Sequence, residues 1–152
     1  MRQLLTRRFD VPLDLPSAWR RLAALEQWPT WARHIRRIEV TPAGPIGPTT
    51  AGRIHLSNGI TSTFRMTEFE EGRAWKWVGP FLGLQVHYDH QFEPVGLHCT
   101  RLTWTLKAEG FAVALLGPLF AAIYGRNLDR AIANFVSSCG VDARPPSARA
   151  HD

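Results

Sequence analysis

The feature that most constrains the fold of this chain is a change in hydrophobic periodicity near residue 110. Between residues 53 and 108 apolar and polar side chains alternate, and turn signals such as Asn58-Gly59 and Glu71-Gly72 separate the alternating runs. Alternation with a period of two indicates strands that bury one face, and such turns join neighbouring strands as hairpins. After Gly110 the apolar residues follow a helical period instead. The sequence therefore predicts an antiparallel meander followed by a long helix.

Two further apolar runs and two short helical segments precede the meander. The expected strands are residues 4–11, 35–41, 53–56, 60–69, 73–78, 84–93 and 100–108. A first short helix is expected from Pro16, after the candidate N-caps Asp14 and Ser17. A second is expected to begin at Pro29 and to bring Trp28 and Trp31 into the core. The expected fold class is α+β, with a curved antiparallel sheet of about seven strands around a long C-terminal helix.

The last helix is expected to turn one apolar stripe, from Leu116 to Phe135, towards the sheet. Pro118 lacks the N–H that a helix interior needs, so the helix either begins there or is kinked there. The sequence leaves both possibilities open. We expect residues 1–138 to form one domain and residues 139–152, which end in ARPPSARAHD, to be a flexible tail.

Composition and charge argue against several classes of protein. The net charge of +5 comes from scattered basic residues and not from a basic block interleaved with aromatic residues, so nucleic acid is not an expected partner. Cys99 and Cys139 form no CxxC pair, so neither a disulfide framework nor a cysteine zinc site is indicated. No signal peptide or run of 18 apolar residues is visible. We therefore expect a cytoplasmic monomer or homodimer without stable membrane insertion.

Short stretches spread along the chain resemble a known family. They are Phe9-Asp-Val-Pro, Ala18-Trp19, Trp28-Pro-Thr-Trp31, Gly52-Arg53, Glu68-Phe69-Glu-Glu-Gly-Arg73, Phe92-Glu-Pro and Thr100-Arg-Leu-Thr103. Together with the order of the elements, they resemble the polyketide cyclase/dehydrase and lipid transport-like family of the START-like (SRPBCC) superfamily, over nearly the whole chain. The resemblance implies a helix-grip fold, like that of START and Bet v 1 proteins. It also implies a deep cavity for a hydrophobic molecule between the sheet and the last helix, without naming the ligand.

The periods of the strands and the last helix assign a set of inward-facing residues as candidate ligand contacts. They are Ser62, Phe64, Met66, Trp75, Trp77, Val86, Tyr88, His90, Trp104, Phe120, Tyr124 and Asn127. The three tryptophans either form aromatic walls for a planar ligand or simply pack the core. Ser62 and Asn127 interrupt apolar stripes, which makes them candidates for orienting a ligand in a mostly apolar pocket.

Three of these residues are also candidates for proton chemistry. The imidazole of His90 is expected on the inner face, where it acts either as an acid, base or hydrogen-bond donor or as a core histidine satisfied by the backbone. The hydroxyls of Tyr88 and Tyr124 either orient a ligand carbonyl or bond to the backbone. No catalytic constellation is recognisable around them, so their assignment as catalytic residues stays open.

No metal or cofactor is expected. His87 and Asp89 share one face of a strand, but this is the solvent face and no third ligand is evident nearby. Cys99 has no assigned base, and no GxSxG elbow or phosphate-binding glycine motif is present. The sequence therefore contains no motif that identifies a reaction.

Three hypotheses for the function follow. The first is a carrier or sensor that binds a small hydrophobic or aromatic molecule, such as a lipid or polyketide, in an internal cavity. The second is a cofactor-free enzyme of the polyketide cyclase or aromatase type, in which His90 and Tyr88 or Tyr124 move protons. The third is a START-like protein-interaction module, which a filled core without a cavity would favour.

Overall fold

The computed structural model describes residues 1–142, with side chains up to residue 140, and in these residues seven strands form one antiparallel sheet. The strands are β1 (Arg2–Val11), β2 (Ile35–Thr41), β3 (Ala51–Leu56), β4 (Thr61–Glu70), β5 (Ala74–Phe81), β6 (Leu84–Gly96) and β7 (Cys99–Glu109). The helices are α1 (Leu15–Ala23), the 3-10 helix η1 (Leu25–Thr30) and α2 (Val113–Asp142). The expected fold class and order of elements are confirmed.

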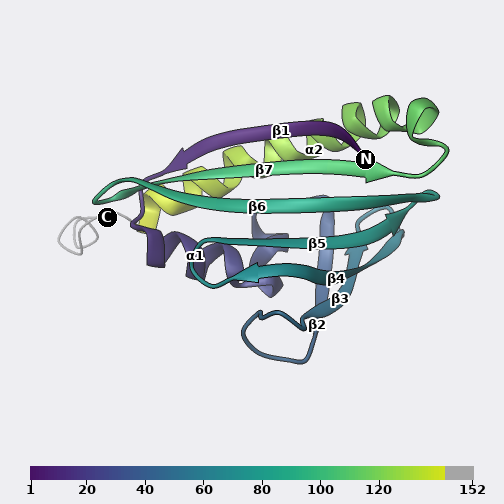
Figure 1. The fold of residues 1–152 in the computed structure, drawn as a ribbon. Coiled ribbons are helices and arrows are strands. Elements are labelled where there is room, and N and C mark those ends of the chain that lie inside the picture. Colours follow the sequence, from purple (N-terminus) through teal and green to yellow (C-terminus); the bar gives the residue numbers. More distant parts are fainter. Residues whose placement is uncertain (143–152) are drawn as a thin grey trace.

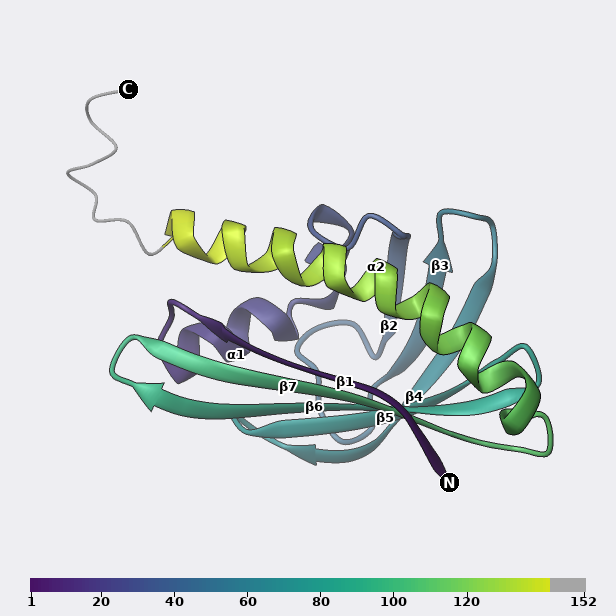
Figure 2. The same cartoon turned by 90° about the horizontal axis from the view of Figure 1, so that it is seen from above.

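The sheet has the strand order β1-β7-β6-β5-β4-β3-β2, and every neighbouring pair is antiparallel. The sheet does not close, because β1 and β2 remain as its two edges. It curves around α2, which runs along the concave side and packs against β1 and β7 (Figures 1 and 2). The α1 helix lies towards the end of the sheet that is away from the first turn of α2 (Figure 2).

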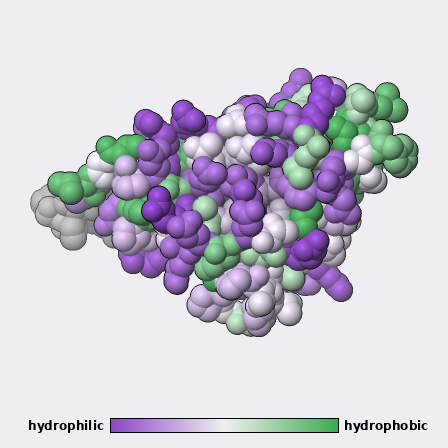
Figure 3. Space-filling view, in the orientation of Figure 1, coloured by the Kyte–Doolittle hydropathy of each residue, from purple (hydrophilic) through white to green (hydrophobic). Residues whose placement is uncertain are grey.

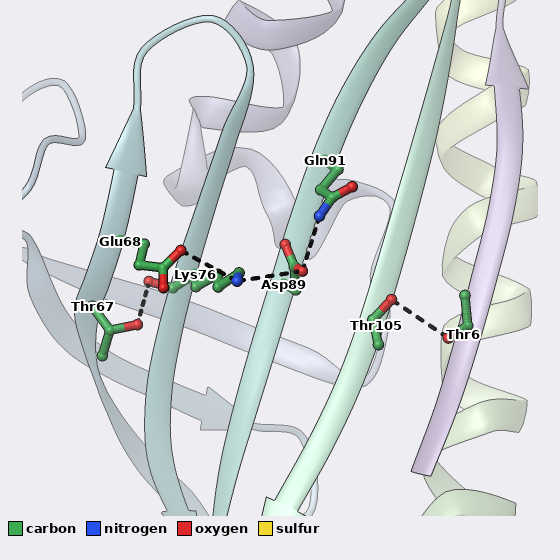
Figure 4. Close-up of polar contacts among 7 residues, drawn as sticks. All are labelled: Thr6, Thr67, Glu68, Lys76, Asp89, Gln91 and Thr105. Atoms are coloured by element: carbon green, nitrogen blue, oxygen red, sulfur yellow. Dashed lines mark hydrogen bonds and ion pairs between the residues drawn. The ribbon is translucent and has the colours of Figure 1, made fainter. Parts of the chain in front are cut away.

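The alternation of side chains along the strands places them on the faces that the sequence predicts. Phe64 and Met66 of β4 and Trp75 and Trp77 of β5 are buried on the concave face. The convex face is polar, and in Figure 4 the Lys76 Nζ atom lies between two carboxylates. It is 3.2 Å from Glu68 Oε2 and 4.0 Å from Asp89 Oδ2. The hydrophobic core therefore lies between the concave face and the helices.

The α1 helix begins close to the position that its sequence predicts. Asp14 is the N-cap, and its side chain accepts a hydrogen bond of 2.9 Å from the Ser17 backbone N–H. The next helix differs from the prediction, since it is a 3-10 helix that starts at Leu25 and holds Pro29 near its end. Its bonds span three residues, as between Gln27 N and Ala24 O at 3.0 Å, which is the pattern of a 3-10 helix.

The α2 helix runs through Pro118, which is one of the two possibilities that the sequence leaves open, and it ends later than the sequence predicts. It starts at Val113, after Gly110 ends β7 with a φ of 131°, so Pro118 lies inside the helix and does not begin it. At the other end it continues past the expected boundary at residue 138, because Cys139 is fully buried and extends the core-facing stripe. Residues 139–142 therefore belong to the helix and not to a tail, and residues 143–152 lie outside the described part.

Aromatic side chains from α1 and η1 fill one half of the concave face. Trp19 packs edge-on against Trp75 with ring centroids 5.2 Å apart. Trp31, which follows η1, stacks at 6.1 Å on Trp104. Trp28 is fixed by a hydrogen bond of 2.8 Å from its Nε1 to the backbone oxygen of Leu22. This packing leaves the other half of the concave face, under the first turns of α2, as the place for a cavity.

Candidate functional site

A cavity of about 300 Å³ lies between the strands β3 to β6 and the N-terminal half of α2. Its volume falls at the lower end of the range of small-molecule sites, which is about 300–1,000 Å³. The turn between β5 and β6 and the loop before β4 complete its walls. No Asp, Glu, Lys or Arg is among the residues that line it. The cavity is therefore a mostly apolar site in which a few neutral polar groups stand out.

Most of the predicted ligand contacts line this cavity. They are Ser62, Phe64, Trp77, Tyr88, His90, Phe120, Tyr124 and Asn127. These residues come from β4, β5, β6 and α2, so the fold brings together side chains that are up to 65 positions apart in the sequence. The alternation along strands and the helical stripe were sufficient signals for these eight positions.

Four predicted ligand contacts do not line the cavity. Met66, Trp75 and Val86 are buried in the core, and Trp104 borders only a separate void of about 30 Å³. They point to the concave face as predicted, but the packing of the α1 and η1 region covers this half of the face. Of the two alternatives that the sequence leaves open for the three tryptophans, Trp75 and Trp104 pack in the core, and Trp77 lines the cavity.

Sequence reasoning missed several residues that line the cavity. His34 and Asn58 are polar, and both lie in connections where no periodicity indicates the direction of a side chain. Leu82 lies at the tip of the β5–β6 turn, and Leu119 and Ile123 belong to the outer side of α2. Ile123 belongs to the apolar stripe that the sequence predicts for the last helix, whereas the apolar character of Leu82 and Leu119 outside any predicted stripe was the one signal for those two residues.

Tyr88 and Tyr124 face each other across the cavity wall, with ring centroids 6.1 Å apart. Phe120 stacks on Tyr124 at 5.3 Å and holds its ring in place. Within residues 1–142 neither hydroxyl has a hydrogen-bond partner in the protein. Burial raises the pKa of Tyr124 to about 12 and raises that of Tyr88 well above its usual value. Both side chains are therefore neutral hydrogen-bond donors towards the cavity at physiological pH.

His90 lies at the inner end of the cavity inside a cage of indole rings. The rings of Trp75 and Trp77 are 4.8 Å and 4.9 Å from the imidazole, and those of Trp28 and Trp104 are 5.9 Å and 6.0 Å away. This desolvation lowers the pKa of His90 to about 3, although a hydrogen bond to the Trp75 backbone opposes the shift. The imidazole is therefore uncharged over the physiological pH range.

The remaining polar groups of the cavity differ in what they can offer a ligand. The Ser62 hydroxyl donates to the Pro80 backbone oxygen at 3.0 Å, so its proton is already used. The Asn58 side-chain oxygen accepts from the Ile60 backbone N–H at 3.0 Å, which leaves its NH₂ group as a donor. Asn127 has no hydrogen-bond partner in the described part of the chain. The polar groups that the cavity offers a ligand are therefore mainly uncharged hydrogen-bond donors.

His34 adds a second imidazole to the cavity wall. Its ring meets Tyr124 edge-on at a centroid distance of 6.1 Å. Burial lowers the pKa of His34, which favours its neutral form. The imidazole of His34 and the phenol of Tyr124 are therefore neighbouring uncharged rings that can both take part in hydrogen bonds.

The remaining ionisable candidates from the sequence lie outside the cavity. His87 pairs with Glu109 at 2.9 Å on the convex face, and Asp89 accepts a hydrogen bond from Gln91 there (Figure 4). In residues 1–142 no three His, Cys, Asp or Glu side chains are grouped in a way that could hold a metal ion. Cys99 lies at the start of β7, far from the cavity lining.

The sequence model of the family described as "Polyketide cyclase / dehydrase and lipid transport" matches residues 2–139. The chain belongs to this family. Its fold is accordingly that of the START (SRPBCC) superfamily, as the resemblance implied. No curated protein matches the chain significantly.

Solved structures with this fold include aromatase/cyclases and a START superfamily protein. The Zhui aromatase/cyclase from a Streptomyces species aligns with a TM-score of 0.69 and 14% identity, over 92% of this chain and 94% of that chain. A START superfamily protein from Mycobacterium smegmatis aligns at 0.67 and 12%, over 90% and 98%. The di-domain ARO/CYC StfQ of steffimycin biosynthesis aligns at 0.68 and 12%, over 91% of this chain and 51% of that chain. At these identities the likeness shows the fold alone.

Proposed function

We propose that the protein binds a small, neutral, mostly apolar molecule that carries at least one hydrogen-bond acceptor, and that it acts as a carrier or sensor. The observation that carries this proposal is a cavity without any charged side chain, in which several donors have no protein partner. An ionised ligand would lose its hydration there without gaining an opposite charge, which costs several kcal/mol. A neutral ligand avoids this cost.

The size of the cavity limits the size of the ligand. An apolar cavity of about 150 Å³ accommodates a benzene-sized molecule. The volume of about 300 Å³ found here suits a ligand of about two rings or an aliphatic chain of similar bulk. The rings of Trp77, Phe120 and Tyr124 offer aromatic surfaces on opposite sides of this space, which favours a flat ligand.

The polar groups suggest where the acceptor of the ligand lies. The Tyr88 and Tyr124 hydroxyls stay protonated because their pKa values are raised, so they donate and do not carry charge. A carbonyl, ether or phenol oxygen between them would satisfy two donors that otherwise lack partners in the described protein. Each such bond to a neutral partner contributes about 1 kcal/mol.

A cofactor-free cyclase or aromatase is the second candidate function, and membership of the family favours it. The tyrosine hydroxyls could stabilise an enolate, as that chemistry requires. A general base works best with a pKa near the operating pH, whereas the pKa of His90 is about 3. This mismatch makes His90 a poor base, so binding is the better supported function. The cavity also removes the observation that would favour the third hypothesis, a filled interaction module.

The binding proposal can be tested with three probes that share a naphthalene ring system. Trp28 and Trp77 line the cavity, so a bound aromatic probe should change the tryptophan emission. We expect 2-acetylnaphthalene, which has an acceptor, to bind more tightly than naphthalene. We expect naphthalene-2-carboxylate, which is charged, to bind most weakly. Equal affinity for the ketone and the carboxylate would contradict the proposed neutral site.

A cavity-filling variant provides the matched control. Ile54→Phe adds a ring at a residue of the cavity wall, and it should abolish binding of the ketone. Val95→Phe adds the same ring at an exposed position on the opposite end of the sheet, and it should leave binding unchanged. Native mass spectrometry of the protein from its own host should show an apolar molecule retained by the wild type and lost in Ile54→Phe. Retention in both variants would place the ligand elsewhere.

The cyclase alternative has its own test. Tyr124→Phe and His90→Ala should abolish turnover of a polyketide-like substrate if these side chains move protons. Turnover that persists in both variants would rule out that assignment. A wild type that binds the neutral ketone but turns over no poly-β-ketone substrate would support the carrier or sensor function.

A further inference from the structure

Exposed apolar side chains surround the mouth of the cavity. Ile60, Leu82, Leu119 and Ile123 line the cavity, and they are 40%, 67%, 60% and 58% exposed. Leu115 and Phe111, at 81% and 101% exposure, extend this apolar surface along the start of α2. We call these six residues the mouth patch. Figure 3 shows the corresponding apolar surface at the end of the molecule where α2 begins.

The arrangement of the mouth patch is regular. Phe111, Leu115, Leu119 and Ile123 are spaced four residues apart, and the last three follow one another along one side of α2, which begins just after Phe111. Leu116 and Phe120 point towards the cavity from the adjoining side of the same helix. The first half of α2 is thus apolar on both its buried and its exposed side, which is unusual for a helix in contact with water.

Charged residues are absent from the sequence around the mouth. The loop at 57–62, the β5–β6 turn at 78–84 and the segment 110–125 contain no Asp, Glu, Lys or Arg. Basic side chains lie at the border: Arg126 follows the uncharged segment directly, and Arg2 pairs with Ala108 beside the start of α2. The nearest acidic residue before the segment, Glu109, pairs with His87 on the convex face.

Leu82 combines two unfavourable features at the centre of this surface. Its φ of 50° lies in the left-handed region, which costs a branched residue free energy that glycine or asparagine would not lose. Its side chain is two-thirds exposed to water at the tip of the turn. Neither the backbone conformation nor burial in the core favours a leucine at this position, whereas contact with an apolar partner does.

We propose that the mouth patch docks on the surface of an anionic lipid bilayer and places the mouth of the cavity against the acyl chains. Within residues 1–142 no helix is long and apolar enough to cross a membrane, so the contact is with the surface. The aliphatic side chains would enter the boundary between headgroups and acyl chains. The basic residues at the border and the net charge of +5 would be attracted to anionic headgroups.

The composition and shape of the patch favour a bilayer over a protein partner. Protein interfaces are anchored by Tyr, Trp and Arg, whereas leucine is under-represented among their strongest contacts. The mouth patch consists of five aliphatic residues and one phenylalanine, without a hydrogen-bonding side chain. It lies on the first turns of α2 and on the turn tips at one end of the sheet, as Figures 1 and 2 show. Such an end can enter a deformable lipid phase without a complementary surface.

The biological role of docking, which is the exchange of an apolar ligand between bilayer and cavity, rests on the proposed function. Docking itself is measured without any ligand, by sedimentation of the full chain with vesicles of phosphatidylcholine and phosphatidylglycerol. We expect the wild type to sediment with these vesicles and less with vesicles of phosphatidylcholine alone. Failure of docking and failure of ligand binding therefore give different results.

Two substitutions test the apolar contact, and a third is a matched control. Leu82→Asn and Leu119→Asn should each lower the vesicle affinity about tenfold, since each removes a buried leucine side chain from the contact. Leu97→Asn changes a leucine that is 88% exposed in the β6–β7 turn, at the opposite end of the sheet, and should leave the affinity unchanged. Arg126→Gln should weaken binding about fivefold on anionic vesicles only.

Three results would overturn the proposal. One is that the wild type sediments with neither kind of vesicle. Another is that Leu97→Asn reduces binding as much as Leu119→Asn, which would indicate non-specific adsorption. The third comes from light scattering in the absence of lipid: a wild-type dimer that Leu119→Asn converts to a monomer would show that the patch is an interface between two copies of this chain.

Discussion

The imidazole of His90 stacks on the indole of Trp75, with ring centroids 4.8 Å apart and an angle of 25° between the planes. The two residues are paired across β5 and β6, so the sheet register itself brings the rings together. Three further indoles enclose the imidazole and exclude water from it. The histidine is therefore held in its neutral form by the core of the protein.

This environment predicts that acid destabilises the protein through His90. The pKa falls from 6.5 in the unfolded chain to about 3 in the folded protein, so between these values the unfolded chain binds more protons. The contribution of His90 to the free energy of unfolding is thus fully present above pH 6.5, and it is lost progressively as the pH falls towards 3. The loss between pH 7 and pH 4 should be about 3 kcal/mol.

His90→Phe removes the titrating group and keeps a ring in the aromatic cage. Urea unfolding should be followed by circular dichroism at a series of pH values. Between pH 7 and pH 4 the free energy of unfolding of this variant should fall by about 3 kcal/mol less than that of the wild type. His98→Gln, which changes an exposed histidine in the β6–β7 turn, should follow the wild type. Parallel pH profiles for the wild type and His90→Phe would show that His90 is not desolvated.

Gly52 is required by the close approach of two strands. A Cβ atom at this position would collide with the backbone oxygen of Glu39 and would lie 2.8 Å from the ring of Phe64. Gly52→Ala should therefore lower the free energy of unfolding by about 2 kcal/mol or more, as overpacking does elsewhere. Gly47→Ala, where nothing lies within 4 Å of the added atom, should change it little. Equal denaturation midpoints for the two variants would contradict this reading of the β2–β3 contact.

The protein should be more stable with asparagine in place of Leu82. The left-handed backbone at this position costs leucine about 1 kcal/mol, whereas asparagine adopts it more readily, and little side-chain burial is lost. We expect Leu82→Asn to raise the free energy of unfolding by about 1 kcal/mol in urea. A stabilised variant that binds vesicles less well would separate docking from folding. A lower stability would mean that the leucine contributes to the fold.

Tyr124→Phe tests the donor role of the tyrosine pair. The change removes one hydroxyl that has no protein partner in the described chain and keeps the ring that stacks on Phe120. Isothermal titration with 2-acetylnaphthalene should show an affinity lowered by about fivefold to tenfold, with unchanged stability. The affinity for naphthalene, which has no acceptor, should stay the same. A loss of affinity for both probes would indicate a change in the shape of the cavity.

The sequence was informative wherever a local pattern sufficed. Alternation placed Phe64 and Trp77 on the concave face, and turn residues placed the hairpins, because these depend on neighbours along the chain. Local patterns were insufficient where distant segments compete for space. The start of α2 before Pro118 depends on the burial of Val113, and the end of the helix depends on the burial of Cys139, both against other elements.

The period of the strands alone determined which side chains of this protein face inward, including His90 and Tyr88. Only the tertiary structure decided which inward side chains line a cavity. The tryptophans of α1 and the η1 region cover the half of the concave face that holds Trp75 and Trp104, and they leave the half near Tyr124 open. The period of a strand determines the face on which each of its side chains lies. The free volume above that face depends on how far the crossing helices extend over it, which is a property of the packing of the whole chain.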